Sequence, residues 1–116
     1  MTMRRIRLMV VGPPSFLPPL VRRAWNGAGI ELQGPVAATD LAAALSTSRA
    51  DGAVIDVDYD APTLLNVVEL LDMLGVPALF ASARPDTRGG FTFSQQPTTI
   101  NAIVNQLLGA NEITLQ

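Results

Sequence analysis

The sequence predicts an α/β protein built on a parallel, doubly wound sheet with right-handed crossovers. Short, almost wholly apolar runs such as Ile6–Val11 indicate strands that are buried on both faces. Between these runs lie segments whose apolar residues follow helical spacing, bounded by proline and glycine. This alternation continues along all 116 residues, a length typical of one domain. We therefore expect a single domain over residues 1–116, with helices on both faces of the sheet.

The amino-terminal half contains two predicted strands and two predicted helices. The first strand ends at the Gly12–Pro14 turn, and Ser15 is a candidate N-cap for the helix that follows. Pro35 suits an edge strand, because proline lacks a backbone donor. Thr39 or Asp40 is expected to cap the second helix. The predicted ranges are a strand over 6–11, a helix over 15–28, a strand over 30–37 and a helix over 39–48.

The carboxyl-terminal half repeats the pattern with one short connection. A helix over 61–74 has Asp60 as its candidate N-cap, Pro62 at its start and Gly75 just past its end. Residues 84–90 are few and glycine-rich, so the fourth helix is expected to be short or missing. The other predicted elements are strands over 53–57, 76–81 and 91–94 and a helix over 97–108. In such sheets the ligand crevice lies at the carboxyl ends of the strands.

The composition excludes several kinds of site. The chain has no cysteine and no histidine, and its eight basic residues are all arginine. Thiol nucleophiles, imidazole bases, His/Cys zinc sites and lysine Schiff bases are therefore ruled out. The formal net charge of −2 and the lack of a basic face argue against direct nucleic-acid binding. No apolar run reaches the ~20 residues of a membrane span, and we expect a cytoplasmic protein.

Residues at the predicted strand ends carry a resemblance to a known family. The stretches "IELQGPVAATDLAAALSTSRADGAVIDVDYD", "PALFASA" and "FSQQPTTINAIVNQLL" resemble the receiver (CheY-like) domains of two-component response regulators in order and spacing. The resemblance covers nearly the whole chain. It implies a flavodoxin-like sandwich with five parallel strands in the order 2-1-3-4-5. It also implies transfer of a phosphoryl group from a phosphohistidine to an aspartate.

The resemblance assigns a role to individual positions. Asp56 matches the phospho-acceptor, and Ser82 matches the hydroxyl residue that follows the fourth strand. Asp58 matches the position whose backbone carbonyl helps to hold Mg²⁺. The family's pair of acidic metal ligands is replaced here by Gly12 and Pro13, and its lysine is replaced by Gln96.

Both replacements weaken the same part of the implied chemistry. Phosphoryl transfer depends on neutralising the charge that builds up on the transferred oxygens, mainly by metal and cation. Without the acid pair we expect weak Mg²⁺ binding at most, since Mg²⁺ prefers oxygen ligands. Without the lysine a strong charge-assisted contact to the phosphoryl group is lost. The sequence therefore predicts a degenerate receiver, or pseudo-receiver, that is not an enzyme and has no cofactor.

Other interpretations of these residues stay open. Asp56 is also a strand-end aspartate able to cap nearby backbone amides or to contact a partner, and Ser82 suits a local hydrogen bond. A weakly active phospho-acceptor using Asp56 and Ser82 is one alternative. The stretch "VVGPPS" also resembles the receiver-like domain of ANTAR-type transcription antiterminators, in which the acid pair is likewise lost. The chain would then be the receiver-like half of such a regulator.

Two predicted helices have surfaces suited to an interface. The helix over 61–74 has a narrow polar stripe of Asn66, Glu69 and Asp72, so apolar surface is left over beyond the face that one sheet needs. The helix over 97–108 carries no charge, and depletion of charge is typical of the centre of an interface. We expect a protein partner, or a homodimer, to use one of these helices. Trp25 is expected to pack in the core.

Overall fold

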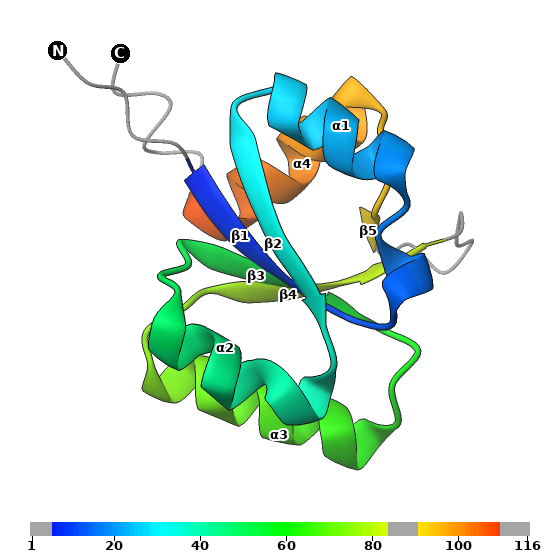
Figure 1. Ribbon diagram of the computed structural model, residues 1–116. Helices are drawn as coiled ribbons and strands as arrows, with labels where there is room; N and C mark the ends of the chain where they lie inside the picture. Colours follow the sequence, from blue (N-terminus) through cyan, green and yellow to red (C-terminus); the bar gives the residue numbers. More distant parts are fainter. Residues whose placement is uncertain (1–5, 84–90, 110–116) are drawn as a thin grey trace, which may run out of the picture.

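The computed structural model describes residues 6–83 and 91–109 and contains one five-stranded parallel sheet between two layers of helices (Figure 1). The strand order is β2-β1-β3-β4-β5, which confirms the predicted order. The strands are β1 (Ile6–Val11), β2 (Ile30–Val36), β3 (Gly52–Asp56), β4 (Ala78–Ser82) and β5 (Phe91–Thr92). The helices are α1 (Pro19–Gly27), α2 (Leu41–Thr47), α3 (Ala61–Met73) and α4 (Pro97–Leu108), with 3₁₀ turns η1 (Pro14–Phe16) and η2 (Ala38–Asp40).

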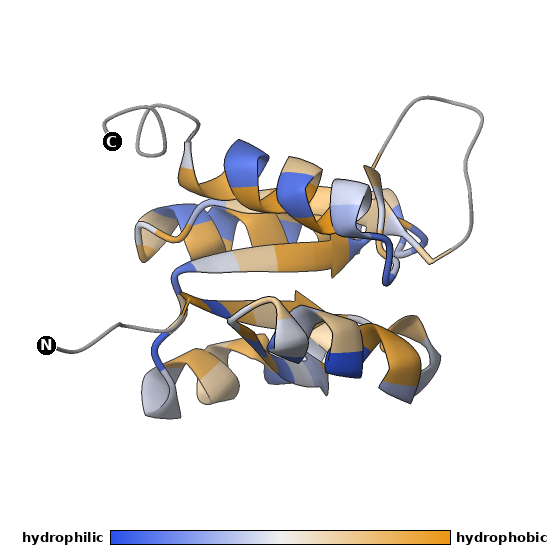
Figure 2. Cartoon of the chain, turned by 90° about the horizontal axis from the view of Figure 1, so that it is seen from above, coloured by the Kyte–Doolittle hydropathy of each residue, from blue (hydrophilic) through white to orange (hydrophobic). Residues whose placement is uncertain are grey.

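Two separate hydrophobic cores lie on the two faces of the sheet. Alternate residues of a strand point to opposite faces, so Leu8 and Val10 join the core under α1 and α4. Met9 and Val11 join the core under α2 and α3. Figure 2 shows that hydrophobic residues predominate in the strands, whereas hydrophobic and hydrophilic residues alternate along the helices. Burial on both faces explains why the strand sequences read as continuous apolar runs.

The first helix begins later than the sequence predicted. Ser15 lies inside η1 and is not the N-cap of α1; that position belongs to Pro18, whose backbone is extended. A residue that precedes proline is disfavoured from helical geometry, so Pro19 sets the first turn of α1. Trp25 is fully buried in the core, as predicted. The predicted short or missing fourth helix falls on residues 84–90, which lie outside the described residues.

Asp60 is the N-cap of α3, as the sequence predicted. The Thr63 backbone N–H donates to Asp60 Oδ1 at 3.1 Å. Hydrogen bonds from Thr63 hold the pKa of the Asp60 carboxyl below its ordinary value of 3.8. A charged carboxylate at this position also interacts favourably with the positive end of the helix dipole.

One edge of the sheet is covered by a side chain. The Arg22 guanidinium on α1 donates to the Leu32 carbonyl at 2.8 Å and also to the Gly34 carbonyl of β2. Unpaired edge carbonyls invite pairing with another chain, so Arg22 protects the β2 edge. None of the described helices has the length and hydrophobicity that a membrane crossing requires.

Candidate functional site

The carboxyl ends of β1, β3 and β4 meet at one edge of the sheet. Val11 of β1 pairs with Ile55 of β3, and Asp56 pairs with Ala81 of β4. Gly12, Asp56 and Ser82 therefore follow one another across three neighbouring strand ends. The structure thus brings together three of the positions that the sequence singled out, at the edge where ligands bind in such folds.

Asp56 is the last residue of β3 and is only 7% exposed. Its Oδ1 accepts a hydrogen bond from the Asp58 backbone N–H at 3.0 Å. This short-range contact is the kind of turn that aspartate side chains form with the backbone two residues on. One carboxylate oxygen of Asp56 thus supports the loop after β3, which is the local role weighed from the sequence. Asp58 itself is exposed.

Ser82 is the last residue of β4 and is 8% exposed. Its backbone carbonyl accepts a hydrogen bond from the Phe93 N–H at 2.8 Å, just beyond the short strand β5. β5 pairs with β4 only through Ala81 and Ser82 among the described residues. Ser82 therefore holds the segment after β5 in register with β4 through its main chain.

The space beside Gly12 is filled by an aromatic ring. A Cβ atom placed on Gly12 would lie 2.9 Å from Phe16 Cδ2 and 3.0 Å from Phe16 Cβ and Cγ. Carbon atoms at optimal contact are about 3.5–4.0 Å apart, so any side chain at this position would displace Phe16. The Gly12 N–H also donates to the Val36 carbonyl of β2 at 2.9 Å, which ties the backbone down. Position 12 is closed to an acidic ligand by packing as well as by residue type.

Phe16 belongs to a buried aromatic cluster that links three segments. Its ring is 1% exposed and stacks on Phe93 with the ring centroids 5.1 Å apart. Phe93 in turn lies 5.3 Å from the Trp25 ring of α1. Trp25 Nε1–H donates to the Ser94 carbonyl at 2.9 Å. Offset and tilted aromatic pairs of this kind add about 0.5–1.5 kcal/mol beyond their buried area, so the cluster anchors η1 and the segment after β5 to α1.

Gln96, at the position of the family's lysine, is exposed and is the N-cap residue of α4. Its backbone N–H donates to Ser94 Oγ at 3.3 Å. A neutral amide at this position supplies no positive charge toward Asp56. The proline that follows it, Pro97, occupies the first turn of α4, where its missing N–H does no harm.

The described residues at this edge do not fit a magnesium ion. Mg²⁺ needs near-octahedral oxygen coordination, usually with one or two carboxylates. Within residues 6–83 and 91–109 there is no group of three or more acidic side chains placed to hold a metal. Gly12 and Pro13 offer no side-chain oxygen, and Asp56 Oδ1 is already engaged by Asp58.

Phe16 is the residue that the sequence did not reveal. It follows two prolines and belongs to neither a strand period nor a helix period, so no pattern assigned it a face. Its partner Phe93 is far away along the chain. The only available signal was an aromatic residue four positions after a strand-ending glycine, which is too common a pattern to carry an inference.

The comparisons with known proteins bear on the fold. No protein-family model matches the chain, and no curated protein matches it. The structure of the chemotaxis protein CheY4 from Vibrio cholerae is similar, with a TM-score of 0.67 and 16% identity over 90% of this chain and 99% of that chain. The response regulator PhyR from Brucella abortus has a TM-score of 0.66 and 17% identity over 97% of this chain and 51% of that chain. The chain therefore has the CheY-like receiver fold that its sequence resembles.

Proposed function

We propose that this chain is a degenerate receiver domain of two-component-type signal transduction that acts as a protein-interaction module without being phosphorylated. The observation that carries the proposal is the Phe16 ring, which occupies the space that a side chain at position 12 would need. The link to signalling is supported by the receiver fold alone, and one fold can serve many functions. The remainder of the proposal rests on the site.

The chemistry expected of a working receiver has too little support here. A transferred phosphoryl group must be held and its charge neutralised by preorganised cations or metal. Among the described residues, the side chains at the positions of the phospho-acceptor, the hydroxyl and the lysine are the Asp56 carboxylate, the Ser82 hydroxyl and the neutral Gln96 amide. A carboxylate and a hydroxyl cannot neutralise the charge of a phosphoryl group. We therefore propose that the protein is not an enzyme and uses no cofactor. We also propose that it works in the cytoplasm, as expected from its sequence.

Intact mass spectrometry tests this proposal. The protein is incubated with acetyl phosphate and Mg²⁺ and then weighed, beside the Asp56→Ala variant as a matched control. We expect no stoichiometric adduct on either protein. A gain of about 80 Da on the wild type, the mass of one phosphoryl group, that is lost in Asp56→Ala would overturn the proposal.

A second candidate is a weakly active phospho-acceptor, favoured by one observation. Asp56 and Ser82 end neighbouring strands and are both retained at the positions that the resemblance assigns to them. This candidate requires measurable Mg²⁺ binding, because phosphoryl transfer of this kind depends on a metal. Isothermal titration calorimetry separates the two candidates: heat from millimolar Mg²⁺ that disappears in Asp56→Asn favours the second, and a flat titration favours the first.

A further inference from the structure

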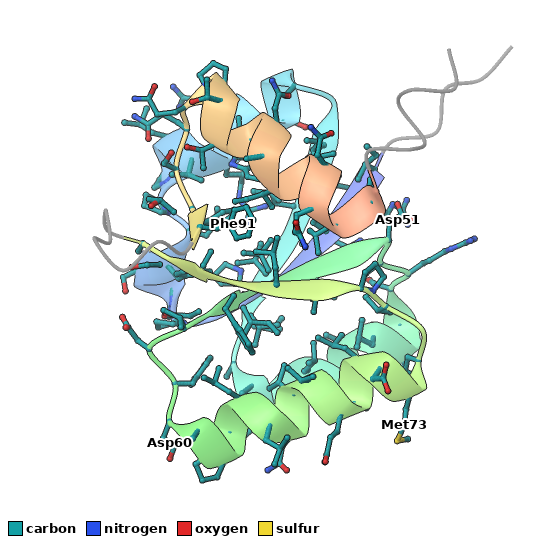
Figure 3. All side chains as sticks on the ribbon, turned by 180° about the vertical axis from the view of Figure 1, so that it is seen from behind. Asp51, Asp60, Met73 and Phe91 are labelled. Atoms are coloured by element: carbon teal, nitrogen blue, oxygen red, sulfur yellow. The ribbon has the colours of Figure 1, made fainter. Side chains whose placement is uncertain are left out.

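A groove lies between α3 and β4 on the face of the sheet opposite α4. It has a volume of about 290 Å³ and is lined mainly by Ile55, Val68, Leu71, Asp72, Val76 and Phe80. Figure 3 shows α3 running beneath β4 from Asp60 to Met73, and the Met73 side chain points away from the sheet. Asp72 is the only charged residue among the described residues of the lining. The groove is therefore an apolar site with one acidic side chain at its rim.

Among the described residues, the helices on this face of the sheet are α2 and α3. The core that these helices cover contains residues of β1 and β3 but none of β4. The β4 side of this face is consequently left open among the described residues.

Exposed apolar side chains extend the groove into a larger surface. Phe80 is 39% exposed in the middle of β4, although a central strand normally buries such a ring. Leu65 on α3 is 58% exposed. Helical spacing places Leu65 on the same stripe as Val68 and Asp72, one and two turns away. We call Leu65, Val68, Asp72 and Phe80 the α3–β4 surface.

The charged residues of α3 and its cap have one sign. Neither α3 nor β4 contains a basic residue, and the charged residues of α3 and its cap are Asp60, Glu69 and Asp72. The described basic residues lie on other elements and are Arg7, Arg22, Arg23 and Arg49. Of these, Arg49 lines a neighbouring pocket with Leu74 and Val76, beyond the carboxyl end of α3. An apolar groove with an acidic rim selects a partner with apolar and basic side chains and disfavours an anionic membrane.

The shape of the site favours a helix as the partner. The stretch of β4 without an outer neighbour is Ala78–Phe80, because β5 pairs only with Ala81 and Ser82 among the described residues. Three residues are short for strand addition, since strands usually have five or six. A groove beside α3 suits a second helix packed at the usual 8–10 Å interaxial distance. Its volume lies just under the 300–1,000 Å³ of small-molecule pockets, which suits one or two anchoring side chains.

We propose that the α3–β4 surface docks a basic amphipathic helix of a partner protein. The partner helix places apolar residues at i, i+3 or i+4 and i+7 into the groove, and its arginine or lysine residues face Asp72 and Glu69. This proposal rests on the proposed function as an interaction module and specifies which face and which partner chemistry that function uses.

Selection from a display library of random 18-residue peptides, with the full chain as bait at 0.15 M salt, tests the proposal. We expect the enriched peptides to be basic and to carry apolar residues at helical spacing. Affinity of a synthetic copy of the strongest peptide is then measured for the variants Leu65→Ser and Asp72→Lys. We expect each variant to weaken binding about tenfold, as expected for loss of one important contact.

Matched controls test whether peptide binding depends on this groove or on any exposed leucine or acidic side chain. Leu20→Ser removes a leucine of similar exposure, 61%, from α1 on the opposite face. Asp40→Lys makes the same charge reversal at the start of α2. Both are expected to bind the peptide within about twofold of the wild type, since neither residue touches the groove. Circular dichroism verifies that every variant is folded, and Phe80→Ser replaces Leu65→Ser if the latter is not.

Three results of the peptide experiments overturn the proposal. They are a selection that enriches no peptide, enriched peptides that are acidic or neutral, and peptide binding that Leu65→Ser and Asp72→Lys leave unchanged. A concentration-dependent dimer of the wild type that Leu65→Ser dissociates would assign the surface to a second copy of this chain instead. The proposed function fails separately, by phosphorylation of Asp56 in the mass measurement, whatever the peptide selection gives.

Discussion

Substitution of Gly12 by alanine measures directly whether the Phe16 ring closes the site. The new Cβ would lie 2.9–3.0 Å from three atoms of the Phe16 side chain. Overpacking of a buried site typically costs about 1–3 kcal/mol. Replacing glycine by alanine also stabilises by about 0.4–1 kcal/mol through the unfolded chain. Overpacking is the larger effect, so we expect a net loss of about 1–2 kcal/mol in the free energy of unfolding.

The same substitution in a Phe16→Ala background isolates the contact with the ring. Phe16→Ala alone is expected to cost about 3–5 kcal/mol, as for other buried phenylalanines. It removes Cγ and Cδ2, which are two of the three close atoms. Gly12→Ala should therefore cost at least about 1 kcal/mol less in this background, a coupling expected only between residues in contact. Urea unfolding followed by circular dichroism gives all four free energies.

Gly27→Ala is the matched control for this cycle. A Cβ on Gly27 meets nothing within 4 Å, so alanine there is expected to be neutral or to stabilise by up to about 1 kcal/mol. The reasoning is refuted if Gly12→Ala is as harmless as Gly27→Ala. It is equally refuted if Gly12→Ala costs the same with and without the Phe16 ring.

Three further predictions concern the cap, the aromatic cluster and the sheet edge. Asp60→Ala should lower the midpoint of thermal unfolding at pH 7, and Asp40→Ala should not, because Asp40 makes no side-chain bond to its helix. Since the folded pKa of Asp60 is lowered from 3.8, this difference should be complete well above pH 4 and vanish as the pH falls through that lowered pKa. Trp25→Phe removes a part-buried hydrogen bond and should cost about 1–3 kcal/mol in urea unfolding. Arg22→Ala should produce concentration-dependent association in sedimentation experiments while Arg23→Ala stays unassociated, because Arg22 donates hydrogen bonds to the carbonyls of the β2 edge.

The fold could be predicted because its signals are local. Strands buried on both faces read as apolar runs, and the helices between them keep their spacing. The cap at Asp60 and the burial of Trp25 were both predicted and are both found. Surplus apolar surface on the third helix was also predicted, and Leu65 and Met73 are exposed there.

The closed site could be predicted only in part. Gly12 and Pro13 in place of acidic residues indicate loss of metal binding from residue type alone. Phe16 fills the space beside Gly12, and its position depends on a contact with Phe93, which lies far away along the sequence. The late start of α1 depends on how the two prolines Pro18 and Pro19 combine. Tertiary contacts between distant segments decide both features, and periodicity does not report them.

The most direct test of the central claim is an amide NMR spectrum recorded before and after addition of acetyl phosphate and Mg²⁺. A phosphorylation-independent domain should keep the amide shifts of Asp56, Asp58, Ser82 and Phe93 unchanged, because Asp56 takes up no phosphoryl group. Asp58 and Phe93 report most sensitively, since their N–H groups bond to Asp56 Oδ1 and to the Ser82 carbonyl. A second set of peaks for these residues, absent in Asp56→Ala, would contradict the account.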